Sequence, residues 1–193
     1  MNKKDNSLQD ELMEKYKYLP EVTKLLDSKK EYFQNGNFEL IDLYSIMLWK
    51  LNRFPTKDGN PLENETLNII KYLAKVTSIT TEVEEKISQL LDVSQFKLPM
   101  VSTILSFVNL DVFQIIDKRT NRIVMGNSSE YSVNYCSHSV SYYVKYLDKL
   151  RTFSKIDFNI AGRAFYQLDI ECKNKLDSKF VESDIEKYQR KYR

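Results

Sequence analysis

The chain of 193 residues is poor in glycine, proline, cysteine and histidine. With only 4 glycines and 4 prolines, tight hairpins must be few, which disfavours an all-β architecture and favours helices joined by short polar loops. Two cysteines, Cys136 and Cys172, and one histidine, His138, cannot supply a four-ligand zinc site without carboxylates, and the spacing of an iron–sulfur cluster is absent. We therefore expect an all-α protein with reduced cysteines that pack as small side chains, without a metal cluster or cofactor.

Long apolar runs and an excess of one charge are missing as well. No window approaches the roughly 18 uncharged apolar residues of a membrane span, and the first residues, MNKKDNSLQDEL, lack the apolar stretch of a signal peptide. We expect a cytoplasmic protein that does not enter a membrane. The 29 Lys and Arg residues nearly balance the 27 Asp and Glu residues, so any phosphate-binding face must be local.

Apolar residues recur along the chain at helical spacing. Residues 8–34 predict two short helices separated at Pro20, because proline interrupts a helix. Residues 39–53 predict an amphipathic helix whose inward stripe has six members. These are Leu40, Leu43, Tyr44, Met47, Leu48 and Leu51. Five further helices are expected. Three of them begin at Asn64, at Thr80 or Thr81, and at Ser183, and the other two span about 132–151 and 157–173.

The stretch from Leu98 to Leu110 contains no charged residue. Its apolar residues cover every side of a helix that begins near Pro99, so this helix should lie in the middle of the domain. Ser102 and Ser106 are small polar residues that let neighbouring elements approach it closely.

Asp117 ends the apolar run that follows this helix, and the basic segment KRTNRIV comes directly after it. An aspartate at a helix start accepts hydrogen bonds from the first turn. The partial positive charge of that turn and the nearby Lys118, Arg119 and Arg122 should keep the carboxylate ionised at neutral pH. Capping alone is enough to explain the residue. The same place also suits a catalytic carboxylate, so both roles stay open.

Four segments together resemble the helix-hairpin-helix DNA glycosylase superfamily, and most closely its small bacterial glycosylase-like members. Residues 81–117 show the order of that family, which is a helix, a hairpin in SQFKLPMVSTIL, a buried helix, a short apolar connection and an aspartate. FQIIDKRTNRIV is similar to the family's apolar run, catalytic Asp and Arg-containing helix. WKLNR at 49–53 and FYQLD near the C-terminus resemble further segments of the small members.

The resemblance implies a two-lobed helical bundle with a cleft between the lobes, in which residues 1–193 form a single unit. One lobe would comprise residues 40–116, with the helix-hairpin-helix at about 81–108. The other would comprise residues 1–39 and 117–193. The implied partner is DNA, double-stranded and contacted at its phosphates, so that the protein would be nucleoid-associated at most.

The implied activity is that of a DNA N-glycosylase that excises a flipped damaged or modified base. Asp117 would be the catalytic residue, stabilising an oxocarbenium ion and orienting or deprotonating water. Relatives that also cut the strand carry an imine-forming lysine just inside the second helix, where this chain has Met100. A monofunctional enzyme without lysine-dependent lyase activity is therefore expected, and borohydride should trap no adduct.

The resemblance also implies two sets of binding residues. The DNA-binding set lies in the hairpin and after Asp117, and consists of Lys97, Leu98, Met100, Lys118, Arg119 and Arg122. The base-pocket set consists of Trp49, Lys50, Arg53, Tyr142 and Gln167. Tyr131, Tyr135, Tyr143 and Tyr166 are further aromatic candidates, since an extruded base is held between aromatic or apolar groups. Aromatic residues at helical spacing also fill cores, and a run of basic residues is also a solvated helix face.

One departure from the family keeps other functions open. Gln95 and Lys97 stand where hairpin glycines are expected, so the backbone loses its closest approach to a phosphate, although Lys97 can meet that phosphate as a charge. The lost glycines favour a non-catalytic DNA-binding descendant of the fold, whereas the retained Asp117 favours the enzyme. A third hypothesis is a helical protein-interaction module in which Asp117 is only a cap.

Overall fold

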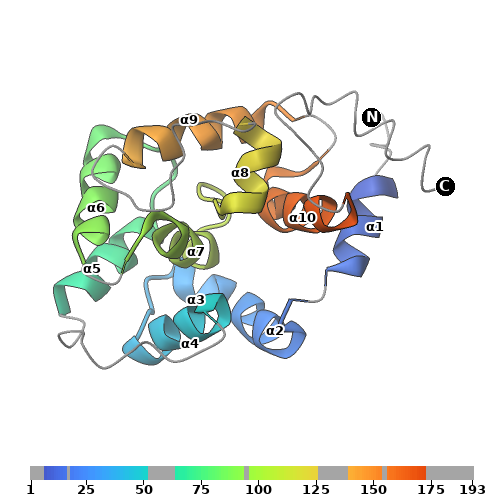
Figure 1. Cartoon of the computed structure of the whole chain (residues 1–193). Helices are drawn as coiled ribbons and strands as arrows, with labels where there is room; N and C mark the ends of the chain where they lie inside the picture. The colour runs from blue at the N-terminus through green and yellow to red at the C-terminus, as the bar shows by residue number, and fades with distance from the viewer. Residues whose placement is uncertain are drawn as a thin grey trace, which may run out of the picture.

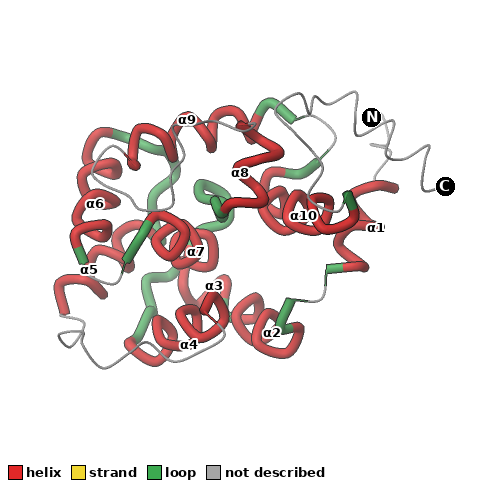
Figure 2. Tube along the Cα trace, viewed as in Figure 1, coloured by secondary structure: helices red, strands yellow, loops and turns green. Residues whose placement is uncertain are grey.

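A computed structural model describes residues 7–16, 18–51, 64–93, 96–125, 139–153 and 156–172 of the chain. Within these ranges the protein has ten α-helices and no strand, so the all-α expectation is confirmed for this part (Figures 1 and 2). The helices are α1 Ser7–Lys15, α2 Pro20–Ser28, α3 Lys30–Gln34, α4 Leu40–Leu51, α5 Asn64–Leu73, α6 Thr81–Asp92, α7 Leu98–Val108, α8 Lys118–Met125, α9 Ser139–Arg151 and α10 Phe158–Glu171. None of these helices is long and apolar enough to cross a bilayer.

Helix α7 lies at the centre of the fold, in contact with α3, α4, α5 and α6 (Figure 1). Every one of its side chains is buried except Pro99, which is half-buried, as the absence of charge in this stretch predicts. Its polar residues bond locally, since the Thr103 hydroxyl donates to the Pro99 carbonyl at 2.7 Å and the Ser106 hydroxyl to the Thr103 carbonyl at 2.9 Å. Satisfied in this way, the hydroxyls remain inside the core at little cost.

The N-terminal region contains three helices, so the expectation of two over residues 8–34 is wrong. Pro20 begins α2 as predicted, but the chain breaks again at Lys29, between α2 and α3. This second break has a packing reason. It turns Phe33 fully into the core and brings the Lys29 ammonium onto the buried carboxylate of Asp42 in α4.

Helix α4 buries a different face from the predicted one. Within the predicted stripe, Leu43 and Met47 are buried and Tyr44 and Leu48 are half-buried. Its two ends, Leu40 and Leu51, are each 38% exposed. Ile46 and Trp49 are buried although neither belongs to that stripe. The reason is that α4 packs against both α2 and α7, so its buried arc is wide and is turned toward two neighbours.

The helices after Asp117 form a group in which α10 packs on α1, α8 and α9. Helix α10 begins after Asp157, whose carboxylate accepts the Asn159 N–H at 2.9 Å, and Cys172 packs half-buried at its end. Helix α9 covers the second part of the predicted helix 132–151. Some predicted features lie outside the described residues. They are residues 132–138 of that helix, the helix expected after Ser183, and the side chains of Tyr131, Tyr135, Cys136 and His138.

Candidate functional site

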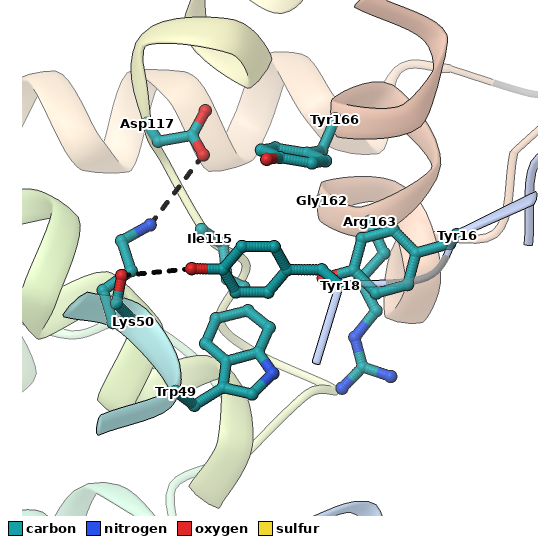
Figure 3. Close-up of a pocket in the computed structure, with 9 residues that line it drawn as sticks. All are labelled: Tyr16, Tyr18, Trp49, Lys50, Ile115, Asp117, Gly162, Arg163 and Tyr166. Carbon is teal, nitrogen blue, oxygen red and sulfur yellow. Dashed lines mark hydrogen bonds and ion pairs between the residues drawn. The ribbon is translucent and has the colours of Figure 1, made fainter. Parts of the chain in front are cut away.

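A cavity of about 200 Å³ opens between four parts of the chain (Figure 3). Its walls come from the α1–α2 connection, the end of α4, the segment before α8 and the middle of α10. The lining residues are Tyr16, Tyr18, Trp49, Lys50, Ile115, Asp117, Gly162, Arg163 and Tyr166. Four aromatic rings and one carboxylate thus line the cavity. Its volume is below the roughly 300–1,000 Å³ of pockets that bind drug-sized ligands, so it suits a ligand group with one ring.

The segment between α7 and α8, residues 109–117, makes a turn at 110–112 and continues as an irregular, mostly buried connection. The backbone groups of residues 114–116 bond to side chains. The hydroxyls of Tyr143 and Tyr146 donate to the carbonyls of Gln114 and Ile115 at 2.7 and 2.8 Å, and the Ile116 N–H donates to the Ser102 hydroxyl at 3.1 Å. Because buried backbone groups must be satisfied, these contacts hold the segment that carries Asp117 in one position.

Helix α10 approaches this segment closely at Gly162. Its N–H donates to the Gln114 side-chain oxygen at 3.1 Å, and a Cβ at residue 162 would lie 3.3 Å from the Ile115 nitrogen. A larger side chain would push α10 away from the segment. The absence of one lets Arg163 and Tyr166 of the same helix reach the cavity (Figure 3).

Asp117 uses its two carboxylate oxygens differently. Oδ1 accepts the N–H groups of Arg119 and Thr120 at 2.8 and 3.0 Å, so the residue is the N-cap of α8. Oδ2 lies 3.8 Å from the Lys50 ammonium nitrogen, and the side chain is 19% exposed (Figure 3). The capping role predicted from the sequence is confirmed. It leaves one oxygen directed at the cavity.

Lys50 faces Asp117 from the last turn of α4. Its side chain is 17% exposed, and its carbonyl accepts the Tyr18 hydroxyl at 3.3 Å. At 3.8 Å the contact with Asp117 is an ion pair and is too long for a hydrogen bond. Burial lowers the pKa of the Lys50 amine below its ordinary value, and the Asp117 charge opposes this shift only in part.

The aromatic walls form a continuous series of ring contacts. Tyr166 meets Tyr16 and Tyr18 edge-on at centroid distances of 6.1 and 6.0 Å, and Tyr18 meets Trp49 at 4.9 Å. Burial raises the pKa of Tyr16, Tyr18 and Tyr166, so these phenols stay protonated at neutral pH. The cavity therefore offers ring edges, ring faces and neutral hydroxyls to a ligand.

Arg163 brings a second cation to the cavity wall, but its charge is already paired with Asp27. Its guanidinium donates to both carboxylate oxygens of Asp27 at 2.7 and 2.5 Å and lies 5.5 Å from the ring centroid of Phe107. Burial lowers the pKa of Arg163, and the Asp27 bonds more than reverse this, so the net shift is upward. Arg163 thus links α10 to α2 and stays charged.

Of the predicted base-pocket residues, the structure brings Trp49 and Lys50 to the cavity together with Asp117. Trp49 is 3% exposed, and its indole N–H donates to the Thr23 hydroxyl at 2.7 Å, so it supports the wall more than it presents a face. Arg53 lies outside the described residues. Gln167 is buried and donates to the Glu171 carboxylate at 2.8 Å, and it is not among the lining residues.

Tyr142, the remaining predicted pocket residue, is buried in α9 and is also absent from the lining. Its hydroxyl donates to the Asn121 side-chain oxygen of α8 at 2.8 Å. Tyr142→Phe should therefore lower the free energy of unfolding by about 1 kcal/mol, the net value of one buried hydrogen bond. Urea denaturation measures this change. A large loss of DNA binding or base release in the folded variant would show that Tyr142 belongs to the functional site.

The predicted DNA-contact residues separate into three groups. Lys97 and Lys118 are exposed. Leu98 and Met100 have buried side chains, 1% and 6% exposed, because both face the core from the first turn of α7. These two residues have only backbone groups to offer a phosphate.

Arg119 and Arg122 form the third group, and both bond to the fully buried Asp169 of α10. Arg119 Nη1 lies 2.9 Å from Asp169 Oδ2, while Arg122 donates from Nη2 and Nε at 2.8 and 3.0 Å. Arg119 also lies over the Tyr166 ring at 5.5 Å. Their first role is therefore to join α8 to α10, which steadies the helix that begins at Asp117.

Sequence reasoning missed Tyr16, Tyr18 and Arg163 as lining residues. The two tyrosines lie in the α1–α2 connection, and Leu19 at its end adopts a left-handed backbone conformation with φ of 39°. Such a conformation is unfavourable for leucine and persists only where the surrounding structure holds it. The YKYLP pattern at residues 16–20 is the only signal in the sequence, and it does not reveal which distant helix the rings meet.

Comparison with known proteins adds no assignment. No protein-family model, curated protein or solved structure matches this chain.

Proposed function

We propose that the protein is a DNA N-glycosylase of the helix-hairpin-helix type, with Asp117 as its carboxylate. The observation that carries this proposal is that the two carboxylate oxygens of Asp117 have different surroundings. One oxygen caps α8, and the other faces an aromatic-lined cavity beside Lys50. An aspartate placed in this way can cap α8 and act on a ligand in the cavity at the same time.

The chemistry asked of Asp117 fits its surroundings. As the bond between base and sugar breaks, positive charge develops on the deoxyribose, and a nearby carboxylate stabilises it and orients the attacking water. The cap holds Oδ1 through two backbone N–H groups, so the carboxylate does not reorient during the reaction. While it is protonated, Lys50 balances the negative charge of Asp117.

The cavity walls also suit a flipped base. A base taken out of the duplex is held by stacking and by hydrogen bonds to its edge. Tyr16, Tyr18 and Tyr166 supply rings with protonated hydroxyls, and the size of the cavity suits one ring system. In this proposal the cavity lies in the cleft of a two-lobed protein, with residues 40–116 as one lobe.

The proposed helix-hairpin-helix consists of α6, residues 93–97 and α7, and Asp117 follows through the buried segment. Pro99 has no N–H, and the Met100 N–H donates to the Lys97 carbonyl at 2.8 Å, so the first turn of α7 has few backbone donors to spare. A phosphate contact then depends on the exposed side chain of Lys97. The same feature favours the second candidate, a DNA-binding protein of this fold without catalysis.

Binding and base release separate these candidates. Duplexes that each carry one modified base, either deaminated, alkylated or oxidised, should bind at low salt, and one class should lose its base in single-turnover assays. Binding to every duplex without release of any base would favour the non-catalytic candidate. Absence of binding at low salt would exclude both DNA-binding functions and leave a protein-interaction module.

Lys97→Ala should weaken DNA binding without regard to base sequence, because a phosphate contact carries no sequence information. The slope of log K against log salt concentration should fall by about 0.9, because the variant neutralises one phosphate fewer. Fluorescence anisotropy over a salt series measures this slope. Lys24→Ala, on the outer face of α2 with 77% of its side chain exposed, is the matched control and should leave the slope unchanged. Equal slopes for both variants would remove Lys97 from the interface.

A further inference from the structure

The backbone of Lys50 is held in place by its neighbours. Tyr18 binds its backbone carbonyl at 3.3 Å, and the neighbouring Trp49 is buried and bonded to Thr23. The side chain then runs along the cavity wall to Asp117, with Tyr18 beside it and Tyr166 across the space (Figure 3). The amine thus has a fixed position inside the cavity, in contrast to the mobile tip of a surface lysine.

The surroundings of this amine are those of a nucleophile. Burial favours the uncharged form of lysine, which carries the reactive lone pair, and a nearby carboxylate can receive the proton that is given up. The Asp117 oxygen at 3.8 Å is close enough to take that proton after a small movement. Position 100, in contrast, offers a buried methionine that has no amine.

We propose that Lys50 is a nucleophilic amine that captures an aldehyde as an imine. The identity of the aldehyde rests on the proposed function, which makes it the C1′ aldehyde of the open-chain deoxyribose left when a base is lost. Lysine-dependent imine chemistry was not expected from the sequence, because Met100 occupies the position of the family's imine-forming lysine. Lys50 supplies the amine from α4 instead, on the opposite side of the cavity from α10.

The reaction balances without any added redox reagent. The neutral amine adds to the aldehyde carbon, a C–N bond forms, and the carbonyl oxygen leaves as water after it has taken up two protons. Both protons come from the nitrogen, and Asp117 relays them. The product is an imine between Nζ and C1′, which water returns to free amine and aldehyde.

Borohydride reduction tests this step directly. Full-length protein is mixed with a duplex that contains one preformed abasic site, and hydride converts any imine to a stable secondary amine. We expect a covalent protein–DNA adduct whose modified peptide contains Lys50. Lys50→Arg, which keeps a positive charge beside Asp117, should lose the adduct completely while retaining DNA binding. Lys24→Met should leave the yield unchanged, and a duplex with a reduced abasic site, which has no aldehyde, should give none.

Reductive methylation tests the amine without DNA. Formaldehyde and cyanoborohydride at neutral pH should modify Lys50 at lower reagent concentration than exposed lysines such as Lys24, as read by peptide mass spectrometry. In Asp117→Asn this preference should increase, because the loss of the carboxylate charge lowers the pKa of the Lys50 amine further and leaves more of it uncharged.

The two experiments keep the inference and the proposed function apart. Abasic DNA that binds without forming an adduct would overturn imine capture and leave the proposed glycosylase standing. A protein that binds no DNA at low salt would overturn the proposed function, and formaldehyde labelling would then decide the amine alone. Surface lysines that react before Lys50 would refute its nucleophilic role in either case.

Discussion

Asp117→Asn should reduce base release by about 10²–10⁴-fold, the usual contribution of a positioned acid or base, while the protein stays folded and continues to bind DNA. The reason lies in the two oxygens of Asp117. The amide oxygen of asparagine can still accept the Arg119 and Thr120 N–H groups and cap α8. The amide nitrogen then replaces Oδ2, and the negative charge beside Lys50 is lost.

Single-turnover base release on the preferred duplex measures this change, with circular dichroism as the test of folding. Asp157→Asn is the matched control, because Asp157 caps α10 in the same way and does not line the cavity. Its activity should equal that of the wild type. Asp117→Ala should lose the cap as well and cost about 1 kcal/mol of stability. Undiminished base release in Asp117→Asn would refute the assignment.

Asp169→Asn should lower the free energy of unfolding by about 3 kcal/mol, the low end of the range for breaking a buried ion pair. Asp169 is fully buried and accepts three hydrogen bonds from Arg119 and Arg122, so the variant loses the charge that balances two guanidinium groups. The low end applies because the Arg119 side chain is 34% exposed and water screens part of its charge. The melting temperature should fall by roughly 6–12 °C for a protein of this size.

Asp148→Asn is the control for this stability measurement. Asp148 pairs with Arg151 at 3.3 Å on the surface of α9, with 70% of its side chain exposed, so its loss should change the unfolding free energy by less than about 0.5 kcal/mol. Below its melting temperature, Asp169→Asn should retain measurable base release, since Asp169 does not line the cavity. Equal stability of the two variants would show that Asp169 does not join α8 to α10 with significant energy.

Much of the secondary structure could be predicted from local pattern. Helix α6 begins after Thr80, whose hydroxyl accepts the Val83 N–H at 3.3 Å, and α7 is buried on all sides as its composition requires. These predictions succeed because helix caps and apolar spacing act within a few residues of one another. The prediction that Asp117 is the N-cap of α8 succeeds for the same reason.

The failures occurred where contacts join distant parts of the chain. Leu40 and Leu51 were assigned inward by spacing, yet the packing of α4 on two helices left them partly exposed and buried Trp49. Arg119 and Arg122 were assigned to DNA from the resemblance, and nothing local in the sequence indicated that they also meet Asp169, about 50 residues later. Periodicity identifies an apolar face without naming its neighbours, and charge does not identify its partner.

The sequence alone determined that the described part of this protein is helical, that α7 is central and that an anion caps α8. Those properties follow from short-range hydrogen bonding and from the cost of exposing apolar surface. Only the tertiary structure decided that Tyr16, Lys50 and Tyr166 line one cavity together with Asp117. The packing of α4 and α10 against the buried segment 109–117 creates that cavity, because these elements meet only when the whole chain has folded.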